Sequence, residues 1–198
     1  MTATPLTATG EFLARLEESK CCAAIVSDEQ LELALASRTP IVFVLRGNGL
    51  TLGPSIQRIH ATGKLAAVHL DLVDGVRADP RGVAWLARLG ADAIITSHGR
   101  LMPVVRKEGA IAILRLLLSR RTHLDTALTA VSRAGPDIIE VLPGVILPSL
   151  GALMPKLGVP LLAGGFIRTE ADAEDVIAAG ATGITTSAPN LWGMYAGA

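Results

Sequence analysis

The stretch 160–187, PLLAGGFIRTEADAEDVIAAGATGITTS, decides the fold of this chain because it predicts a strand, a helix and a second strand in succession. Thr169 is the expected N-cap of the helix, and Asp172 three residues later forms an Asp variant of the capping box. Gly180 stands where the helix should end, and the apolar run TGITTS follows it closely. Two strands that are apolar on both faces and joined by a helix are typical of a parallel sheet.

The same rhythm of strand and helix recurs along the whole chain. Apolar runs rich in Val, Ile and Ala begin at eight positions: Cys21, Ile41, Lys64, Asp92, Ala110, Asp137, Val159 and Thr182. Stretches with helical character lie at residues 29–36, 51–61, 80–89, 101–107, 123–134, 144–156, 169–179 and 190–195. Glycine follows an expected helix end at Gly90, Gly109, Gly135, Gly158 and Gly180, and Asp79 with Pro80 begins one helix. This repetition indicates serial βα units.

Eight consecutive βα units predict a closed (β/α)8 TIM barrel, with a doubly wound open sheet as the alternative. The chain has 198 residues, and about 200 is the lower limit for such barrels. Little sequence is left for insertions, and no linker or low-complexity segment divides the chain. We therefore expect one compact barrel domain over residues 1–198.

The composition restricts the possible partners. Lys and Arg number 18 and Asp and Glu number 18, so the formal net charge is zero, unlike that of a constitutive binder of nucleic acid or membrane surfaces. No apolar run approaches the ~18 residues of a membrane span, and the N-terminus lacks the pattern of a secretory signal. The adjacent Cys21 and Cys22 are interpreted as small buried residues in a reducing cytoplasm. We expect a cytoplasmic protein without a membrane partner.

Polar residues gather where the expected strands end, which is the face of a barrel that carries the chemistry. They are Arg46, Asn48, His69, Asp71, Asp74, Thr96, Ser97, His98, Arg115, Glu140, Arg168, Thr169, Thr185, Thr186 and Ser187, and the glycine pair Gly164 and Gly165 ends the seventh strand. The strands are otherwise apolar. This clustering predicts a ligand site at the carboxyl end of the barrel.

The ends of the last two strands predict a phosphate site. Gly164 and Gly165 allow backbone N–H groups to approach an anion closely. Thr186 and Ser187 form a small polar cluster after the eighth strand, and barrels commonly bind phosphate between these two strand ends. The alternative is that the glycines only form a tight turn and that Ser187 only caps the short final helix.

His69 and Asp71 are two residues apart on a strand and therefore share a face. They fit an acid/base pair, a pair that binds hydroxyl groups or part of a metal site, and the alternative is a structural histidine beside a capping aspartate. No further Cys or His spacing completes a zinc site, so we expect no metal.

Glu140 lies in the apolar run IIEVL, where a buried carboxylate requires a partner. Arg46 and Arg115 are candidate partners from other strands, and both are also candidates for contact with a ligand anion. Structural ion pairing and ligand binding are equally consistent with this trio.

Basic residues outside the strand ends form two small groups, Arg106 with Lys107 and Arg120 with Arg121. Solvated helix faces are the default interpretation, and a local nucleic-acid patch is the alternative. Aromatic platforms for stacking single-stranded RNA are essentially absent from the sequence.

The segment AVHLDLVDG at residues 67–75, the segment DIIEVLPGVI from Asp137 and the stretch 160–187 together resemble the glycerol-3-phosphate responsive antiterminator family. The resemblance runs from about Ile41 to Trp192. It implies a (β/α)8 barrel that binds glycerol 3-phosphate, then binds the leader mRNA of glycerol-utilisation genes and prevents transcription termination. It also implies a regulator that is not an enzyme and needs no cofactor.

The resemblance places the phosphate at Gly164, Gly165 and Ser187. The residues expected at the glycerol end or supporting it are His69, Asp71, Arg46, Arg115, Glu140 and Arg168. The RNA contact is expected at Arg120, Arg121, Arg106 and Lys107, and a homo-oligomer is an open alternative to a monomer.

The alternative function is an enzyme that acts on a phosphorylated three-carbon substrate, with His69, Asp71 and Glu140 as acid/base groups. Schiff-base chemistry would require a lysine at a strand end. The four lysines, Lys20, Lys64, Lys107 and Lys156, all lie elsewhere in the sequence, so we favour the regulator.

Overall fold

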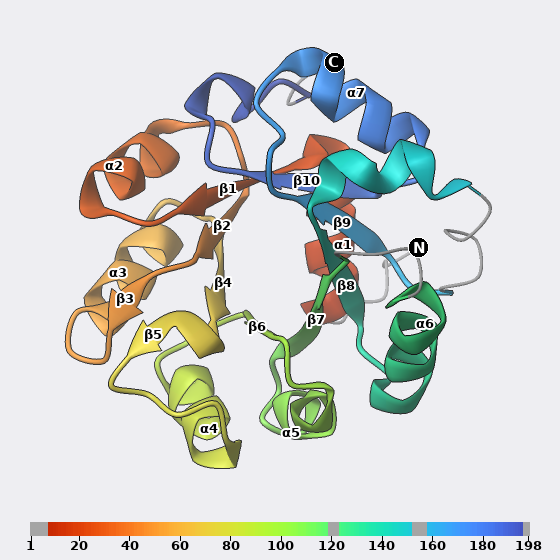
Figure 1. Cartoon of the computed structure of the whole chain (residues 1–198). Coiled ribbons are helices and arrows are strands. Elements are labelled where there is room, and N and C mark those ends of the chain that lie inside the picture. The colour runs from red at the N-terminus through yellow and green to blue at the C-terminus, as the bar shows by residue number, and fades with distance from the viewer. Residues whose placement is uncertain (1–7, 119–122, 152–157, 196–198) are drawn as a thin grey trace, which may run out of the picture.

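A computed structural model describes residues 8–118, 123–151 and 158–195 (Figure 1). Eight parallel strands close into a barrel in the order β1-β10-β9-β8-β7-β6-β4-β2. The strands are β1 (Cys21–Ile25), β2 (Ile41–Val44), β4 (Leu65–His69), β6 (Ala93–Thr96), β7 (Ile111–Leu117), β8 (Ile138–Leu142), β9 (Leu161–Gly164) and β10 (Gly183–Thr186). Each coincides with one of the predicted apolar runs, so the (β/α)8 barrel is confirmed and the open sheet is wrong.

Helices surround the barrel (Figure 1). They are α2 (Asp28–Ala36), α3 (Leu52–Ala61), α4 (Pro80–Arg88), α5 (Met102–Lys107), α6 (His123–Ala134) and α7 (Glu170–Ala178). The predicted N-caps are confirmed, because the Asp79 carboxylate accepts from two N–H groups of α4 and Thr169 forms a capping box with Asp172. The five predicted glycine stops all have a positive φ, which glycine adopts without steric cost.

Two predicted helices take another form. The stretch 144–156 begins as the 3-10 helix η3 (Gly144–Ser149) with Pro148 inside it, and proline lacks the N–H group that an α-helix would need there. Residues 152–157 lie outside the described residues. The predicted helix at 190–195 is the three-residue 3-10 helix η5 (Pro189–Leu191) followed by turns.

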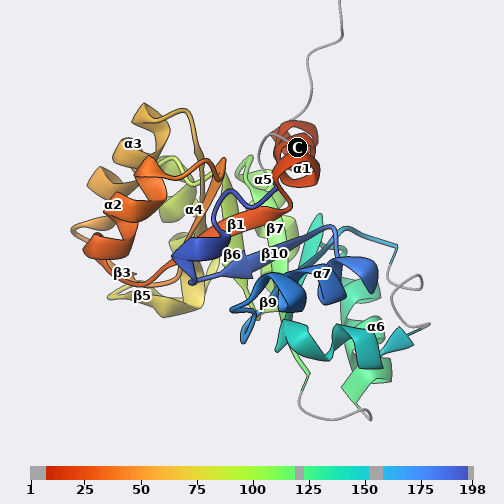
Figure 2. The same ribbon diagram turned by 90° about the horizontal axis from the view of Figure 1, so that it is seen from above.

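Two elements were not predicted from the sequence. Helix α1 (Ala8–Ser19) precedes the first strand, and a small parallel sheet pairs β3 (Gly47–Asn48) with β5 (Val73–Asp74). In Figure 2, α1 lies at one end of the barrel, away from β3 and β5. Phe12 and Leu16 of α1 pack against the apolar interior of the barrel and close its amino end.

The strands alternate their side chains between two apolar layers, as parallel strands buried on both faces do. The inner layer includes Phe43, Ala67, Ile113, Ile138 and Leu162, and the outer layer packs the strands against the helices. Cys21 and Cys22 are both free and buried, one in each layer. Among the described helices, none is long and apolar enough to cross a membrane.

Candidate functional site

Four polar side chains enter the barrel above its apolar interior, close to the carboxyl ends of the strands. His69 ends β4, Arg115 lies on β7, Glu140 on β8 and Thr185 on β10. His69, Arg115 and Glu140 each follow an inward-facing residue by two positions, so they share its face of the strand. We call these four residues the mouth cluster.

Arg115 and Glu140 form a buried ion pair within the mouth cluster. Nε of Arg115 donates to Oε2 of Glu140 over 2.7 Å, and the two residues are opposite one another in the β7–β8 register. The Thr185 hydroxyl donates to the other carboxylate oxygen, Oε1, over 2.6 Å. Glu140 therefore has the partner that its apolar surroundings require, and Arg115 supplies it.

Gly164 at the end of β9 leaves the space that this network occupies. A Cβ at this position would lie 2.9 Å from Oε1 of Glu140 and closer still to the Thr185 hydroxyl. Any other side chain would displace the network. Gly164, which the sequence analysis assigned to phosphate binding, is thus required for packing around Glu140 and Thr185.

His69 is the unsatisfied member of the mouth cluster. Its side chain is buried, with 3% of the residue exposed, and neither ring nitrogen has a hydrogen-bond partner within the described residues. Burial, followed by the positive charge of Arg115, lowers the pKa of His69 to about 4. The neutral imidazole at pH 7 has one donor and one acceptor available for a ligand.

Asp71 is held by the end of the neighbouring strand β6. It accepts hydrogen bonds from the Thr96 hydroxyl and from both the N–H and the hydroxyl of Ser97, at 2.8 and 2.5 Å for Ser97. Burial alone would raise the pKa of Asp71, but the hydrogen bonds from Ser97 and Thr96 outweigh it and hold the pKa below its ordinary value. Asp71 therefore stays ionised beside His69 without being bonded to it.

The predicted phosphate segment has an unusual backbone at Gly165 and Phe166. Both residues have positive φ, 81° and 62°, and a bulky residue in this region is rare and strained. Within the described residues no protein acceptor takes the N–H of Phe166 or of the exposed Ser187. Successive N–H groups in such turns form anion-binding concavities.

Thr186 does not present its hydroxyl to this segment. The hydroxyl donates to the Ile167 carbonyl over 2.7 Å and accepts from the N–H of Ala188 over 3.1 Å. The Thr186 carbonyl in turn accepts from the indole N–H of Trp192. Thr186 thus connects the two loops. The inward threonine, Thr185, was predicted at the end of the eighth strand but not as a residue of the ligand site.

The two remaining arginines predicted for the ligand site are exposed. Arg46 lines a separate hollow of about 400 Å³ over the ends of β1 and β2, together with Asp28 and Asp74, and has no bond to Glu140. The backbone N–H of Arg168 donates to Asp172 and its carbonyl accepts from Asn190, and no residue in the described part of the chain contacts its guanidinium in a hydrogen bond or ion pair.

The basic groups predicted for RNA lie elsewhere. Arg106 and Lys107 end α5, which leads to the amino end of β7 and hence to the opposite end of the barrel. Arg106 donates to the Gly135 carbonyl. Arg120 and Arg121 lie outside the described residues.

Other chemistry has little support in the described part of the chain. No group of three His, Cys, Asp or Glu there could hold a metal ion. Lys64 precedes β4, at the amino end of the barrel, and its ammonium donates to the carbonyls of Ser37 and Thr39. Lys20 and Lys107 also lie off the carboxyl ends, and Lys156 is not described.

The rim around the mouth cluster carries several exposed apolar side chains. Six exposed large hydrophobic residues follow or end barrel strands at this face: Val26, Leu50, Leu72, Leu117, Val145 and Phe166. Exposed apolar groups gathered on one face mark contact surfaces. These apolar side chains lie among exposed polar residues of the same face, such as Arg46, Arg168 and Ser187.

A closed parallel barrel of eight strands with alternating helices defines a (β/α)8 barrel protein. Proteins of this class commonly carry their sites at the carboxyl ends of the strands. The chain belongs to the glycerol-3-phosphate responsive antiterminator family, whose model matches residues 21–192. The family resemblance seen in the sequence is thereby confirmed.

Individual relatives agree with this family. An uncharacterised Escherichia coli (strain K12) protein, YgcP, is 31% identical over 178 residues, which is 89% of this chain and 93% of YgcP. The crystal structure of the Listeria monocytogenes glycerol uptake operon antiterminator regulatory protein is similar with a TM-score of 0.82 at 28% identity, covering 87% of this chain and 94% of that one. A Thermotoga maritima glycerol uptake operon antiterminator-related protein has a TM-score of 0.78 at 26% identity, covering 87% and 96%. These findings support a regulator of the antiterminator type.

Proposed function

We propose that the mouth cluster and the loops after β9 and β10 bind glycerol 3-phosphate as a regulatory effector. The observation that carries this proposal is the buried imidazole of His69 with no partner on either ring nitrogen. An unpaired buried polar group is costly, and a ligand hydroxyl removes that cost. The glycerol hydroxyls can both donate to and accept from the ring nitrogens of His69. The choice of glycerol 3-phosphate as the ligand comes from the description of the family.

The phosphate would bind at the turn of Gly165 and Phe166 and beside Ser187. The N–H groups of Phe166 and Ser187 have no protein acceptor in the described part of the chain, and charge-assisted hydrogen bonds to an anion are short and strong. Arg115 provides a positive charge nearby but is already paired with Glu140. Its role is to keep the site polar and His69 neutral.

The ligand-bound protein would then bind the leader RNA of glycerol-utilisation genes and prevent termination. Such a switch requires the RNA-binding state to have the higher affinity for glycerol 3-phosphate. The proposal rests on family membership and on two relatives described as proteins of the glycerol uptake operon. In the mouth cluster the carboxylate of Glu140 accepts from Arg115 and from the hydroxyl of Thr185, an arrangement that suits ligand binding.

Isothermal titration calorimetry with glycerol 3-phosphate tests the effector, with glycerol and inorganic phosphate as separate arms. We expect saturable binding of glycerol 3-phosphate that is weakened about tenfold or more in His69→Ala and unchanged in Arg133→Ala, on the far side of the barrel. Absence of binding at millimolar ligand would reject the effector. A gel shift with the leader transcript, with and without ligand, tests the RNA. Turnover of glycerol 3-phosphate that disappears in Glu140→Gln would establish the enzyme instead.

A further inference from the structure

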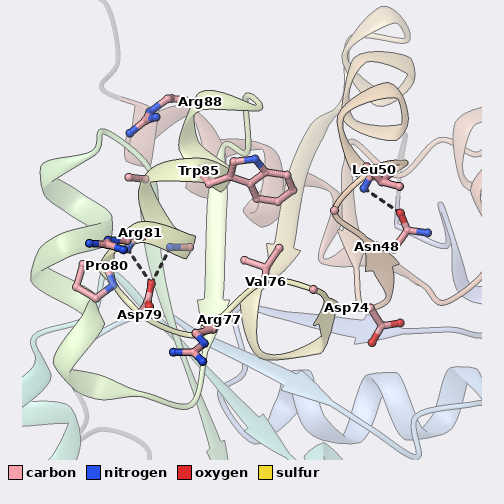
Figure 3. A pocket seen from close by; sticks show the side chains of 14 residues that line it. Asn48, Leu50, Asp74, Val76, Arg77, Asp79, Pro80, Arg81, Trp85 and Arg88 are labelled. Atoms are coloured by element: carbon pink, nitrogen blue, oxygen red, sulfur yellow. Dashed lines mark hydrogen bonds between the residues drawn. The ribbon is translucent and has the colours of Figure 1, made fainter.

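A large groove lies outside the barrel and is separate from the mouth cluster. It has a volume of about 1230 Å³ and runs between the β3–α3 loop, the segment after β5 and helix α4. Figure 3 shows Trp85 of α4 in this groove, between Val76 on one side and the loop of Asn48 and Leu50 on the other. The proposed effector site uses none of these residues.

Helix α4 gives the groove its chemistry. Arg81, Trp85 and Arg88 are spaced i, i+4 and i+7, so their Cβ atoms start from the same half of the helix. In Figure 3 the Trp85 ring points towards the loop of Asn48 and Leu50, and the guanidinium groups of Arg81 and Arg88 extend from the outer edge of the groove. Arg77, just before the helix, adds a third guanidinium, and Figure 3 shows it near Asp79. Gly49 faces the ring of Trp85, since a Cβ there would lie 3.7 Å from it.

These groups have few partners in the protein. Within the described residues Arg88 has no ion pair or hydrogen bond, and the indole N–H of Trp85 has no acceptor. Arg77 and Arg81 interact electrostatically with Asp79, whose carboxylate already caps α4 through the N–H groups of Arg81 and Gly82. The groove therefore combines three guanidinium groups and a partly exposed aromatic ring with two carboxylates, those of Asp74 and of the helix cap Asp79.

We propose that this groove binds single-stranded RNA, with a base stacked on Trp85 and with phosphates contacted by Arg77, Arg81 and Arg88. Single-stranded nucleic acid is bound by positively charged grooves with aromatic rings on which bases stack. The inference rests on the proposed function and locates the RNA that the function requires. It would let a chain with zero net charge bind a polyanion, because three arginines lie on α4 and in the segment just before it.

A short segment of chain joins the two sites. His69 ends β4, Asp71 lies in η1 (Leu70–Leu72), and β5 follows immediately and leads to Val76 and Arg77 in the groove wall. Asp71 is anchored to β6, while β5 pairs with β3 beside the groove. A ligand that contacts His69 thus acts on the same segment that forms one wall of the groove, which gives effector and RNA a physical link.

The test measures RNA binding by anisotropy of a labelled, unstructured RNA of about twelve nucleotides, within the usual site size of such grooves, and of the leader transcript. Glycerol 3-phosphate is present in one arm and absent in the other. The variants are Trp85→Phe, which keeps an apolar ring in the groove, and Arg88→Ala. Arg133→Ala is the matched control, because Arg133 also lies exposed in the last turn of a helix, α6, on another side of the barrel.

We expect RNA to bind more tightly with glycerol 3-phosphate and to quench tryptophan fluorescence. Arg88→Ala should weaken binding and reduce the slope of log affinity against log salt by about 0.7. Trp85→Phe should weaken binding by about threefold, because the smaller ring still stacks on a base but with less overlap, and should abolish the quenching, because the remaining Trp192 is buried. Arg133→Ala should bind as the wild type does.

If Trp85→Phe and Arg88→Ala both bind RNA with wild-type affinity, the groove is not the RNA-binding site, and the proposed function is unaffected. Failure of the wild type to bind either RNA, with calorimetry still showing the effector, would reject the RNA part of the proposed function and the groove together. Binding of a poly-glutamate peptide that is sensitive to Arg88→Ala and Trp85→Phe, with no RNA bound, would make the groove a protein-docking site and overturn the inference.

Discussion

Arg115 and Glu140 are opposite one another on β7 and β8, and their side chains meet over 2.7 Å with only 10% and 1% of their surfaces exposed. Removing one member of a buried pair leaves the other charge uncompensated, which typically costs about 3–5 kcal/mol. We expect Arg115→Met to lower the free energy of unfolding by this amount in urea denaturation. The double variant Arg115→Met/Glu140→Gln should be less destabilised than the sum of the single variants, and strict additivity would show that the pair does not interact.

The low pKa of His69 should make stability depend on pH. The folded pKa of about 4 lies below the ordinary value of 6.5, so the unfolded chain binds a proton more readily. The stabilisation is therefore complete above pH 6.5 and is lost as the pH falls towards 4, by on the order of 2–3 kcal/mol. Urea denaturation across this range measures it. His69→Gln should flatten that part of the curve, and an unchanged slope would show that other groups cause it.

Much of the fold follows from local sequence signals. The eight apolar runs, the N-caps Asp79 and Thr169 and the glycine stops all correspond to elements of the barrel, because parallel strands and helix ends depend on short-range patterns. Helix α1 was missed although Phe12 and Leu16 have helical spacing, because it lies outside the repeating unit. Its position against the barrel interior depends on residues far along the chain.

The sequence predicted that the site lies at the carboxyl ends of the strands, but it did not predict which side chains point into it. Glu140 and Arg115 were recognised as candidates because a carboxylate in an apolar strand needs a partner. Thr185 and Thr186 have the same chemistry, and only the register of β10 decides that Thr185 faces inward while Thr186 bonds to loop backbone. The groove was not predicted either, because Leu50, Val76 and Trp85 come together only in the folded protein.

Gly164 and Gly165 should respond differently to alanine. At Gly164 a Cβ would meet the Thr185 hydroxyl and Glu140, so Gly164→Ala should destabilise the fold by about 1–3 kcal/mol through overpacking. At Gly165 the nearest atom would be 3.7 Å away, and the cost arises from its φ of 81°, about 1–2 kcal/mol. Thermal and urea denaturation measure the free energy of unfolding of Gly164→Ala and of Gly165→Ala. The double variant Gly164→Ala/Thr185→Ser should remain destabilised, whereas Gly164→Ala/Thr185→Ala should recover part of the loss because the displaced hydroxyl is gone.

Thr186 and Ser187 provide a matched pair that separates structure from ligand binding. Thr186→Val removes a buried hydroxyl with two hydrogen bonds to backbone and should lower the free energy of unfolding by about 1–3 kcal/mol. Ser187→Ala changes an exposed residue, so its stability should stay within ~0.5 kcal/mol of the wild type, while its affinity for glycerol 3-phosphate falls severalfold if the hydroxyl contacts the phosphate. Urea denaturation and calorimetry of both variants measure the two effects independently. If Ser187→Ala binds glycerol 3-phosphate with unchanged affinity, Ser187 contributes only its backbone N–H. If Gly165→Ala also binds with unchanged affinity, the phosphate does not bind at the loops after β9 and β10.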